Sequence, residues 1–356
     1  MKKLLLAAAV TTLSISAVQA APTLYGKLNV TIDQVDNSDF KGNNVTEINS
    51  NASRLGVKGE EKLTDKISAV YLAEWEVSTD GNDDKDWGMR NRFLGLKFAD
   101  IGTLKAGRYD SYFKTAAGKY QDIFNDHNHL DITSTMYGED RLNNSIGFET
   151  DKKLLAGLQF NIMAEQGESS TEATEGTTGN DSKRNGFGDA ISTSLTYENK
   201  HLGLAAALAG NFGAQGKYNG LDGKKYFSNA VRVTGSYDLG KAGVDGLVVG
   251  ALYQQAEPTD DVIDYKGLEE QAWLVSATYS IPNTPWAVKG QYQSAETTAD
   301  NMKDRTIDQY GIGVDYSFNK QARLYGVLAQ QERDWKNGPE EDDTKTVLGL
   351  GMEYNF

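Results

Sequence analysis

The chain is poor in cysteine and histidine, the side chains that most often act as nucleophiles, general bases and zinc ligands. The 356 residues include no cysteine and three histidines, His127, His129 and His201. His127 and His129 lie close in sequence to Asp126 and Asp131, and these four side chains could be drawn as a metal site. Metal centres need ligands held on a fixed scaffold, however, and two histidines in a loop are more often solvated. No Ser, His and Asp set has a common scaffold either. We therefore expect neither an enzyme nor a bound metal or cofactor.

The first twenty residues have the pattern of a secretory signal peptide. Lys2 and Lys3 precede an apolar run over residues 4–10, and a small-residue cleavage site ends at Ala20. The apolar run is shorter than the ~20 residues that a helix needs to span a bilayer. We expect residues 1–20 to be cleaved, leaving one domain over residues 21–356. Removing Lys2 and Lys3 from the 36 basic residues leaves 34 against 50 acidic ones, a net charge of −16 that argues against a nucleic-acid partner.

After residue 20 the chain repeats one pattern, a segment that alternates apolar and polar residues and then turns. In the first such segment Leu28, Val30 and Ile32 alternate with Asn29 and Thr31. A period of two indicates a strand with one apolar face, and a low mean hydropathy, −0.53 here, is compatible with a transmembrane β-barrel. We expect an all-β, antiparallel, up-and-down barrel of about sixteen strands at 24–33, 53–61, 66–77, 89–99, 102–109, 141–150, 154–167, 187–199, 202–213, 227–238, 246–256, 270–281, 285–296, 306–318, 321–334 and 344–356.

The connections between these segments alternate in length. Short turns at 61–64, 100–101, 151–153, 281–284 and 319–320 interleave with long polar loops near 34–52, 78–88, 110–140, 166–186, 213–226, 256–269, 297–305 and 335–343. Outer-membrane barrels have short turns on the periplasmic side and long loops outside the cell. The sequence therefore predicts the orientation of the barrel as well as its strands.

Aromatic residues on the apolar parity of the strands also favour a membrane barrel. Tyr71, Trp75, Tyr253 and Trp273 lie near predicted strand ends, where amphipathic rings suit the headgroup region. The last segment places its apolar residues on one parity, and these are Leu348, Leu350, Met352, Tyr354 and Phe356.

Together these features resemble the general diffusion porins of Gram-negative outer membranes, over essentially the whole chain after residue 20. The residues that carry the resemblance are Leu24–Leu28, Ser53–Glu61, Arg90–Lys97, Gly102–Arg108, Asn143–Ile146 and Tyr354–Phe356. The resemblance implies an outer-membrane homotrimer of sixteen-stranded barrels, each a water-filled channel for passive diffusion of ions and small hydrophilic solutes. It also implies a third loop that folds inward, and a terminal strand whose Tyr354 and Phe356 are read by the barrel-assembly machinery.

In such porins basic side chains on the wall of the constriction face carboxylates on the third loop, residues 110–140. Carried over by position, the basic set is Lys27, Arg54, Arg90 and Arg141, with Arg92 added because it shares the parity of Arg90. The alternation independently assigns all five to the polar, inward parity. The acidic candidates are Asp122, Asp126 and Asp131. The segment from Gln121 to Asp126 replaces the Pro-Glu-Phe-Gly-Gly tip of enteric porins, so the acid at the constriction stays open.

Selectivity and partners are less determined by the sequence. The net charge of −16 favours cations, whereas the basic set favours anions. Acidic stretches at 80–84, 257–261 and 340–343 suggest contact with lipopolysaccharide and outer-membrane lipid through divalent cations. A substrate-specific channel and a structural or adhesive barrel are the alternatives. A sugar channel should show aromatic residues along the lumen, but most aromatics here lie on the apolar parity.

Overall fold

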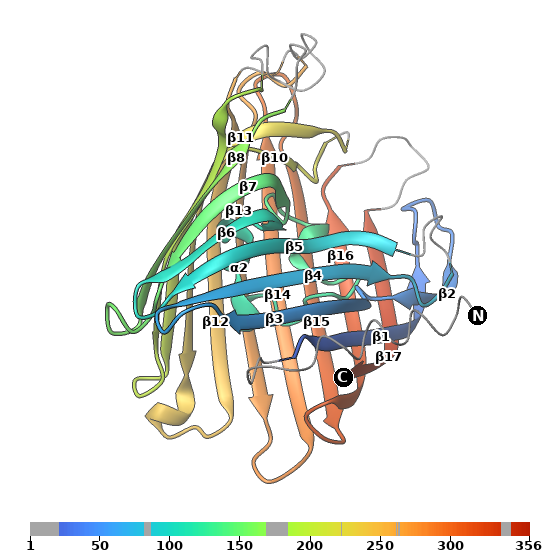
Figure 1. Cartoon of the computed structure of the whole chain (residues 1–356). Coiled ribbons are helices and arrows are strands. Elements are labelled where there is room, and N and C mark those ends of the chain that lie inside the picture. Colours follow the sequence, from blue (N-terminus) through green and yellow to red (C-terminus); the bar gives the residue numbers. More distant parts are fainter. Residues whose placement is uncertain are drawn as a thin grey trace, which may run out of the picture.

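The computed structural model describes residues 21–81, 87–168, 184–221, 223–260, 262, 264–335 and 343–356. Within these ranges the chain forms one antiparallel sheet that closes on itself, with β1 paired to β17. Figure 1 shows the strands wrapping into one continuous wall. The strands are β1 (Thr23–Asp36), β2 (Val45–Ser50), β3 (Arg54–Lys62), β4 (Ile67–Val77), β5 (Trp87–Phe98), β6 (Gly102–Asp110), β7 (Arg141–Thr150), β8 (Leu158–Gln166), β9 (Phe187–Asn199), β10 (Leu204–Lys217), β11 (Lys225–Asp238), β12 (Leu247–Pro258), β13 (Glu269–Ser280), β14 (Trp286–Thr298), β15 (Arg305–Ser317), β16 (Ala322–Arg333) and β17 (Thr344–Asn355).

These segments make sixteen barrel strands, because β2 and β3 are two parts of one strand. β2 pairs with β1 from Val30 to Val35, and β3 pairs with β1 from Thr23 to Lys27. The break between them includes Ala52, whose φ of 49° is incompatible with a strand. The prediction of a sixteen-stranded antiparallel barrel is confirmed. The expected loop at 34–52 was partly wrong, because residues 45–50 pair as a strand.

The two faces of the wall follow the alternation in the sequence. On β1 the side chain of Ile32 is 57% exposed on the outside, whereas Thr31 is 1% and Asp33 0% exposed on the inside. The other strands show the same arrangement, with apolar side chains on the outer face and polar side chains on the inner face. An apolar outer band around a polar interior suits a wall that has hydrocarbon outside and water inside.

No helix in the described ranges is both long and apolar enough to cross a membrane.

The ring closes at the ends of β1 and β17. Gly26 and Phe356 exchange two backbone hydrogen bonds, with N···O distances of 3.0 and 3.1 Å. The ring of Phe356 occupies the space that a Cβ on residue 26 would need. A glycine at position 26 therefore lets the terminal aromatic side chain pack over the first strand.

The segment between β6 and β7, here called loop 3 (residues 110–140), folds into the barrel. It contains α2 (Tyr112–Thr115), α3 (Gly118–Gln121) and the 3-10 turn η1 (Ile132–Ser134). Its apolar side chains pack against inward-facing residues of the wall: Phe113 and Tyr137 against β10 to β12, Ile132 against β12 to β14, and Phe124 against β16. The interior of the barrel is therefore partly filled by loop 3.

Candidate functional site

Four of the five basic residues expected at the constriction line one cavity. Lys27, Arg54, Arg90 and Arg141 project from β1, β3, β5 and β7 into a space of about 440 Å³. Lys27 and Arg54 are direct partners in the β1–β3 pairing. We call these four residues the basic cluster and the space the cationic cavity. The other charged residues that line it are Glu74, Asp110, Lys114 and Asp126.

Asp126 is the acid of loop 3 that reaches the basic cluster. Its Oδ2 lies 2.5 Å from Lys27 Nζ and 3.0 Å from Arg54 Nη2. Burial alone would raise the pKa of Asp126, but the neighbouring charges of Arg54 and Lys27 outweigh it and hold that pKa below its usual value. Asp126 is therefore ionised at neutral pH and neutralises part of the cluster.

Two further carboxylates hold the arginines in place. Glu74 on β4 lies 2.6 Å from Arg90 Nε and 3.9 Å from Arg54 Nε, and it accepts a hydrogen bond of 2.9 Å from the Tyr25 hydroxyl. Asp110 lies 3.2 Å from Arg141 Nε. The sequence showed Glu74 on the polar parity of its strand but gave no sign that it would be a partner of Arg90, because that contact depends on the register between β4 and β5.

Arg92 lies on the outer face, so its assignment to the basic cluster was wrong. The register between β5 and β4 shifts at this point. Arg92 pairs with Ala73, whereas Met89 pairs with Trp75. Three steps along β5 thus match two along β4, and this extra residue reverses the alternation between Arg90 and Arg92. The Arg92 guanidinium stacks over the outward-facing ring of Trp75, 5.1 Å from its centroid.

The other two acidic candidates do not line the cationic cavity. Asp122 is 2% exposed and accepts a hydrogen bond of 3.0 Å from the Asn125 amide. Burial raises the pKa of Asp122 to about 7, and burial together with the charge of Asp122 raises the pKa of Asp131. These two acids lie within loop 3 or against the wall and are poorly placed to act on ions in the cavity.

The histidines of loop 3 contact the wall rather than a metal site. His127 Nδ1 accepts a hydrogen bond of 3.3 Å from the His129 amide, and its Nε2 lies 3.8 Å from Asp33 Oδ1. Burial lowers the pKa of His127 to about 4, although Asp33 acts in the opposite direction. His129 Nε2 lies 2.7 Å from Glu47 Oε1, and His201 is exposed. Within the described ranges no group of three or more His, Cys, Asp or Glu residues could hold a metal ion.

Comparison with known proteins decides the family. A family model described as Gram-negative porin matches residues 5–336. The chain belongs to the Gram-negative porin family. It is 26% identical to the major outer membrane protein P.IB of Neisseria sicca, over the full length of both chains. The porin is therefore an outer-membrane channel and not an enzyme.

Solved structures show the same fold. The porin is similar to an anion-selective porin from Comamonas acidovorans, with a TM-score of 0.73 and 19% identity over 94% of this chain and 99% of that one. It is also similar to the trimer form of OmpT from Vibrio cholerae, with a TM-score of 0.66 and 16% identity over 94% and 99% of the two chains.

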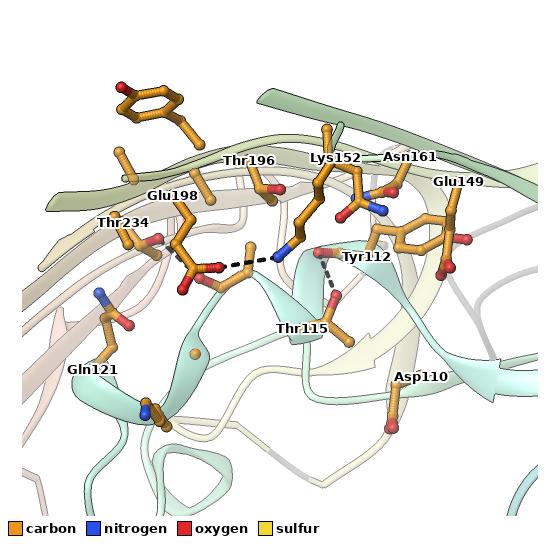
Figure 2. Close-up of a pocket in the computed structure, with 18 of the residues that line it drawn as sticks. Asp110, Tyr112, Thr115, Gln121, Glu149, Lys152, Asn161, Thr196, Glu198 and Thr234 are labelled. Carbon is orange, nitrogen blue, oxygen red and sulfur yellow. Dashed lines mark hydrogen bonds and ion pairs between the residues drawn. The ribbon is translucent and has the colours of Figure 1, made fainter. Parts of the chain in front are cut away.

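The porin has a second interior cavity, of about 450 Å³, between the helices of loop 3 and the inner faces of β5 to β11. We call it the loop cavity. Figure 2 shows Lys152 and Glu198 pointing toward each other across it, with a 3.2 Å ion pair between them. Asn91 and Asp110 line both cavities, so the loop cavity adjoins the cationic cavity.

Proposed function

We propose that ions and small hydrophilic solutes cross the porin through the cationic cavity, past Asp126 and the basic cluster that line it, and that this passage gives a weak preference for anions. The supporting observation is the charge of the cationic cavity. Five cationic side chains line it against three carboxylates, a local excess of two positive charges; the cations are Lys27, Arg54, Arg90, Lys114 and Arg141.

The positive excess in the cavity and the negative net charge of the chain favour opposite ions. The distance of each set of charges from the permeating ion decides which one dominates. The chain as a whole carries −14, but much of that charge lies in the outer loops. Charges further than the Debye length, ~8 Å at physiological ionic strength, are largely screened. An ion in the cationic cavity is therefore governed by the side chains that line it. The close ion pairs of Lys27 and Arg90 keep the preference weak.

The reversal potential of single channels under a KCl gradient tests this proposal. The native porin should show a small anion preference. Arg54→Gln combined with Arg90→Gln removes two positive charges, and we expect the ratio of anion to cation permeability to fall about two- to threefold, as a change of about 0.5 kcal/mol would give. Lys62→Gln is the control, because it removes an exposed positive charge at the end of β3 that does not line the cationic cavity. An unchanged reversal potential in the double variant would exclude the cluster as the selective element.

We also propose that the porin assembles as a homotrimer through the outer face of β5 to β7. Arg92 and Arg108 are direct partners there, and within the described residues the Nε atoms of both are buried without a hydrogen-bond partner. Two arginines that lie directly opposite each other repel, and charged side chains on a lipid-facing wall are unfavourable, which together favour a protein neighbour over this part of the wall. The solved trimer form of a structural relative supports the same assembly.

Cross-linking in native membranes tests the trimer. Cross-linking of the native porin should give a trimeric band, and single-channel recording should show three equal conductance steps. Arg92→Glu combined with Arg108→Glu should give monomers. Gln271→Glu, on the outer face of β13, should leave the trimer intact. Trimers that persist in the arginine double variant would place the interface elsewhere on the wall.

The remaining partners are proposed from the sequence. Residues 1–20, the expected signal peptide, lie outside the described residues, as do parts of the acidic loops expected to meet lipopolysaccharide, at 82–84, 261 and 340–342. The packing of Phe356 over Gly26 is compatible with a terminal segment that the assembly machinery reads. The mass of the mature protein, and the yield of a Phe356→Ser variant in the membrane, would test the two biogenesis proposals.

A further inference from the structure

The loop cavity carries polar groups but little net charge. Lys105 Nζ lies 2.5 Å from Glu149 Oε1, and Lys152 Nζ lies 3.2 Å from Glu198 Oε2. These pairs neutralise two of the three lysines that line the cavity, and the third, Lys119, faces a lining whose remaining acid, Asp110, also pairs with Lys114 and Arg141. The cavity therefore differs from the cationic cavity beside it, whose lining has an excess of positive charge.

The uncharged part of the lining combines aromatic and alanine side chains with hydroxyl and amide groups on adjacent strands. Thr196 and Gln159 are direct partners between β8 and β9, and Thr234 on β11 lies on the same inner wall (Figure 2). Within the described part of the chain the Thr196 hydroxyl has no hydrogen-bond partner. The Gln159 amide already donates to the Thr150 carbonyl, and the Thr234 hydroxyl donates to the Ala116 carbonyl. The Thr196 hydroxyl and the acceptor oxygens of Gln159 and Thr234 remain to match a molecule with several hydroxyl groups.

The junction of the two cavities is held in a fixed geometry. The Asn91 side chain donates a hydrogen bond of 2.6 Å to Asp110 Oδ2 and accepts one of 2.9 Å from Arg141 Nε. Arg141 therefore stands at the end of the cationic cavity that adjoins the loop cavity. A molecule at the junction would meet positive charge on one side and neutral polar groups on the other.

We propose that the two cavities together form a binding subsite for small hydroxylated carboxylates. The carboxylate lies among Arg54, Arg90 and Arg141, and the hydroxylated part extends under loop 3 to Thr196 and Gln159. This inference rests on the proposed passage of anions through the cationic cavity, and it adds saturable binding to passive diffusion.

Block of the single-channel KCl current tests the subsite. Gluconate carries both chemical parts, glucose only the hydroxyls and acetate only the carboxylate. We expect gluconate, added on the side of the short turns, to reduce the current at a concentration about tenfold lower than glucose or acetate, the ratio that a joint contact of ~1.4 kcal/mol would give. Block by gluconate that is no stronger than block by glucose and acetate added together would overturn the proposal.

Two isosteric variants test whether gluconate binds in the loop cavity or at another part of the wall. Thr196→Val removes the hydroxyl and should weaken gluconate block about three- to fivefold, the effect of one lost hydrogen bond, without changing acetate block. Thr193→Val is the matched control on β9, since Thr193 pairs with Ile162 on the outer face. If Thr196→Val and Thr193→Val weakened gluconate block equally, the proposed binding in the loop cavity would be overturned.

The reversal potential, measured on the same channels, distinguishes this inference from the proposed selectivity. If the channel prefers anions but gluconate does not block it preferentially, the subsite proposal is wrong and the selectivity proposal stands. Absence of anion preference would remove the selectivity proposal and, with it, the carboxylate end of the subsite.

Discussion

Loop 3 meets the barrel wall in two different ways. Toward β10 to β16 it is attached by buried apolar clusters and by hydrogen bonds to its own backbone: Arg232, 0% exposed, donates to the carbonyl oxygens of Phe113 and Tyr137. Toward β1 to β7 it faces the wall through ion pairs beside an open cavity, of which Asp126 with Lys27 is the closest.

The attached side of loop 3 fixes the position of the loop, and the open side selects among permeating ions. On the attached side the contacts exclude water, so each is energetically sensitive to loss of a partner. On the open side the charged side chains line the cationic cavity and act on whatever passes. Loop 3 can therefore present Asp126 at a fixed place because its other side is held by Arg232 and by packed aromatic rings.

The largest expected effect is on the attached side. Arg232→Met should destabilise the porin by about 3–5 kcal/mol, because the buried Glu139 carboxylate, now 2.7 Å from Arg232, loses its charge partner. Urea unfolding in detergent measures the loss. Adding Glu139→Gln should restore part of the stability. Lys27→Met should cost less, because Arg54 stays 3.0 Å from Asp126; an equal cost for the two variants would contradict the comparison.

The next effect is on the pH dependence of stability. Burial lowers the pKa of folded His127 to about 4, from its usual value of 6.5, so the fold favours neutral His127. Its contribution is fully present above pH 6.5 and is lost as the pH falls from 6.5 to 4, by about 3 kcal/mol at most. Unfolding free energies measured across this window should decline, and His127→Gln should flatten the decline. A slope that is unchanged in the variant would remove His127 as its source.

The smallest effect concerns the acids of loop 3. Asp126→Asn removes a carboxylate from the cationic cavity and should raise the anion preference about twofold, a change of ~0.4 kcal/mol. Asp122→Asn should leave the reversal potential unchanged, because Asp122 does not line the cavity. Similar shifts from the two substitutions would show that position in loop 3 does not decide selectivity.

The alternation in the sequence was enough to predict the strands and most of the inner face. Lys27, Arg54 and Arg90 fell on the polar parity, and a closed barrel must turn that parity toward its interior. The prediction failed for Arg92 because one extra residue on β5 reverses the two faces. Such a bulge depends on the pairing with β4 and leaves no mark in the alternation of β5 alone.

The contacts of loop 3 could not be predicted in the same way. The sequence offered Asp122, Asp126 and Asp131 as equivalent acids, since each lies in a long loop without a period. Their different positions result from long-range packing, such as that of Phe124 against Tyr325 and Val327. Only the folded barrel decides that Asp126 faces the cavity while Asp122 is buried.

Closure of the ring through Gly26 and Phe356 has a consequence for the order of events during folding. The strand that completes the sheet is separated from its partner by more than three hundred residues of sequence, so this pairing has the longest loop to close. Until β17 docks, β1 and β16 each present an unpaired edge that can join another chain. The time between export and ring closure is thus the interval in which the porin most needs a protein that covers open strand edges.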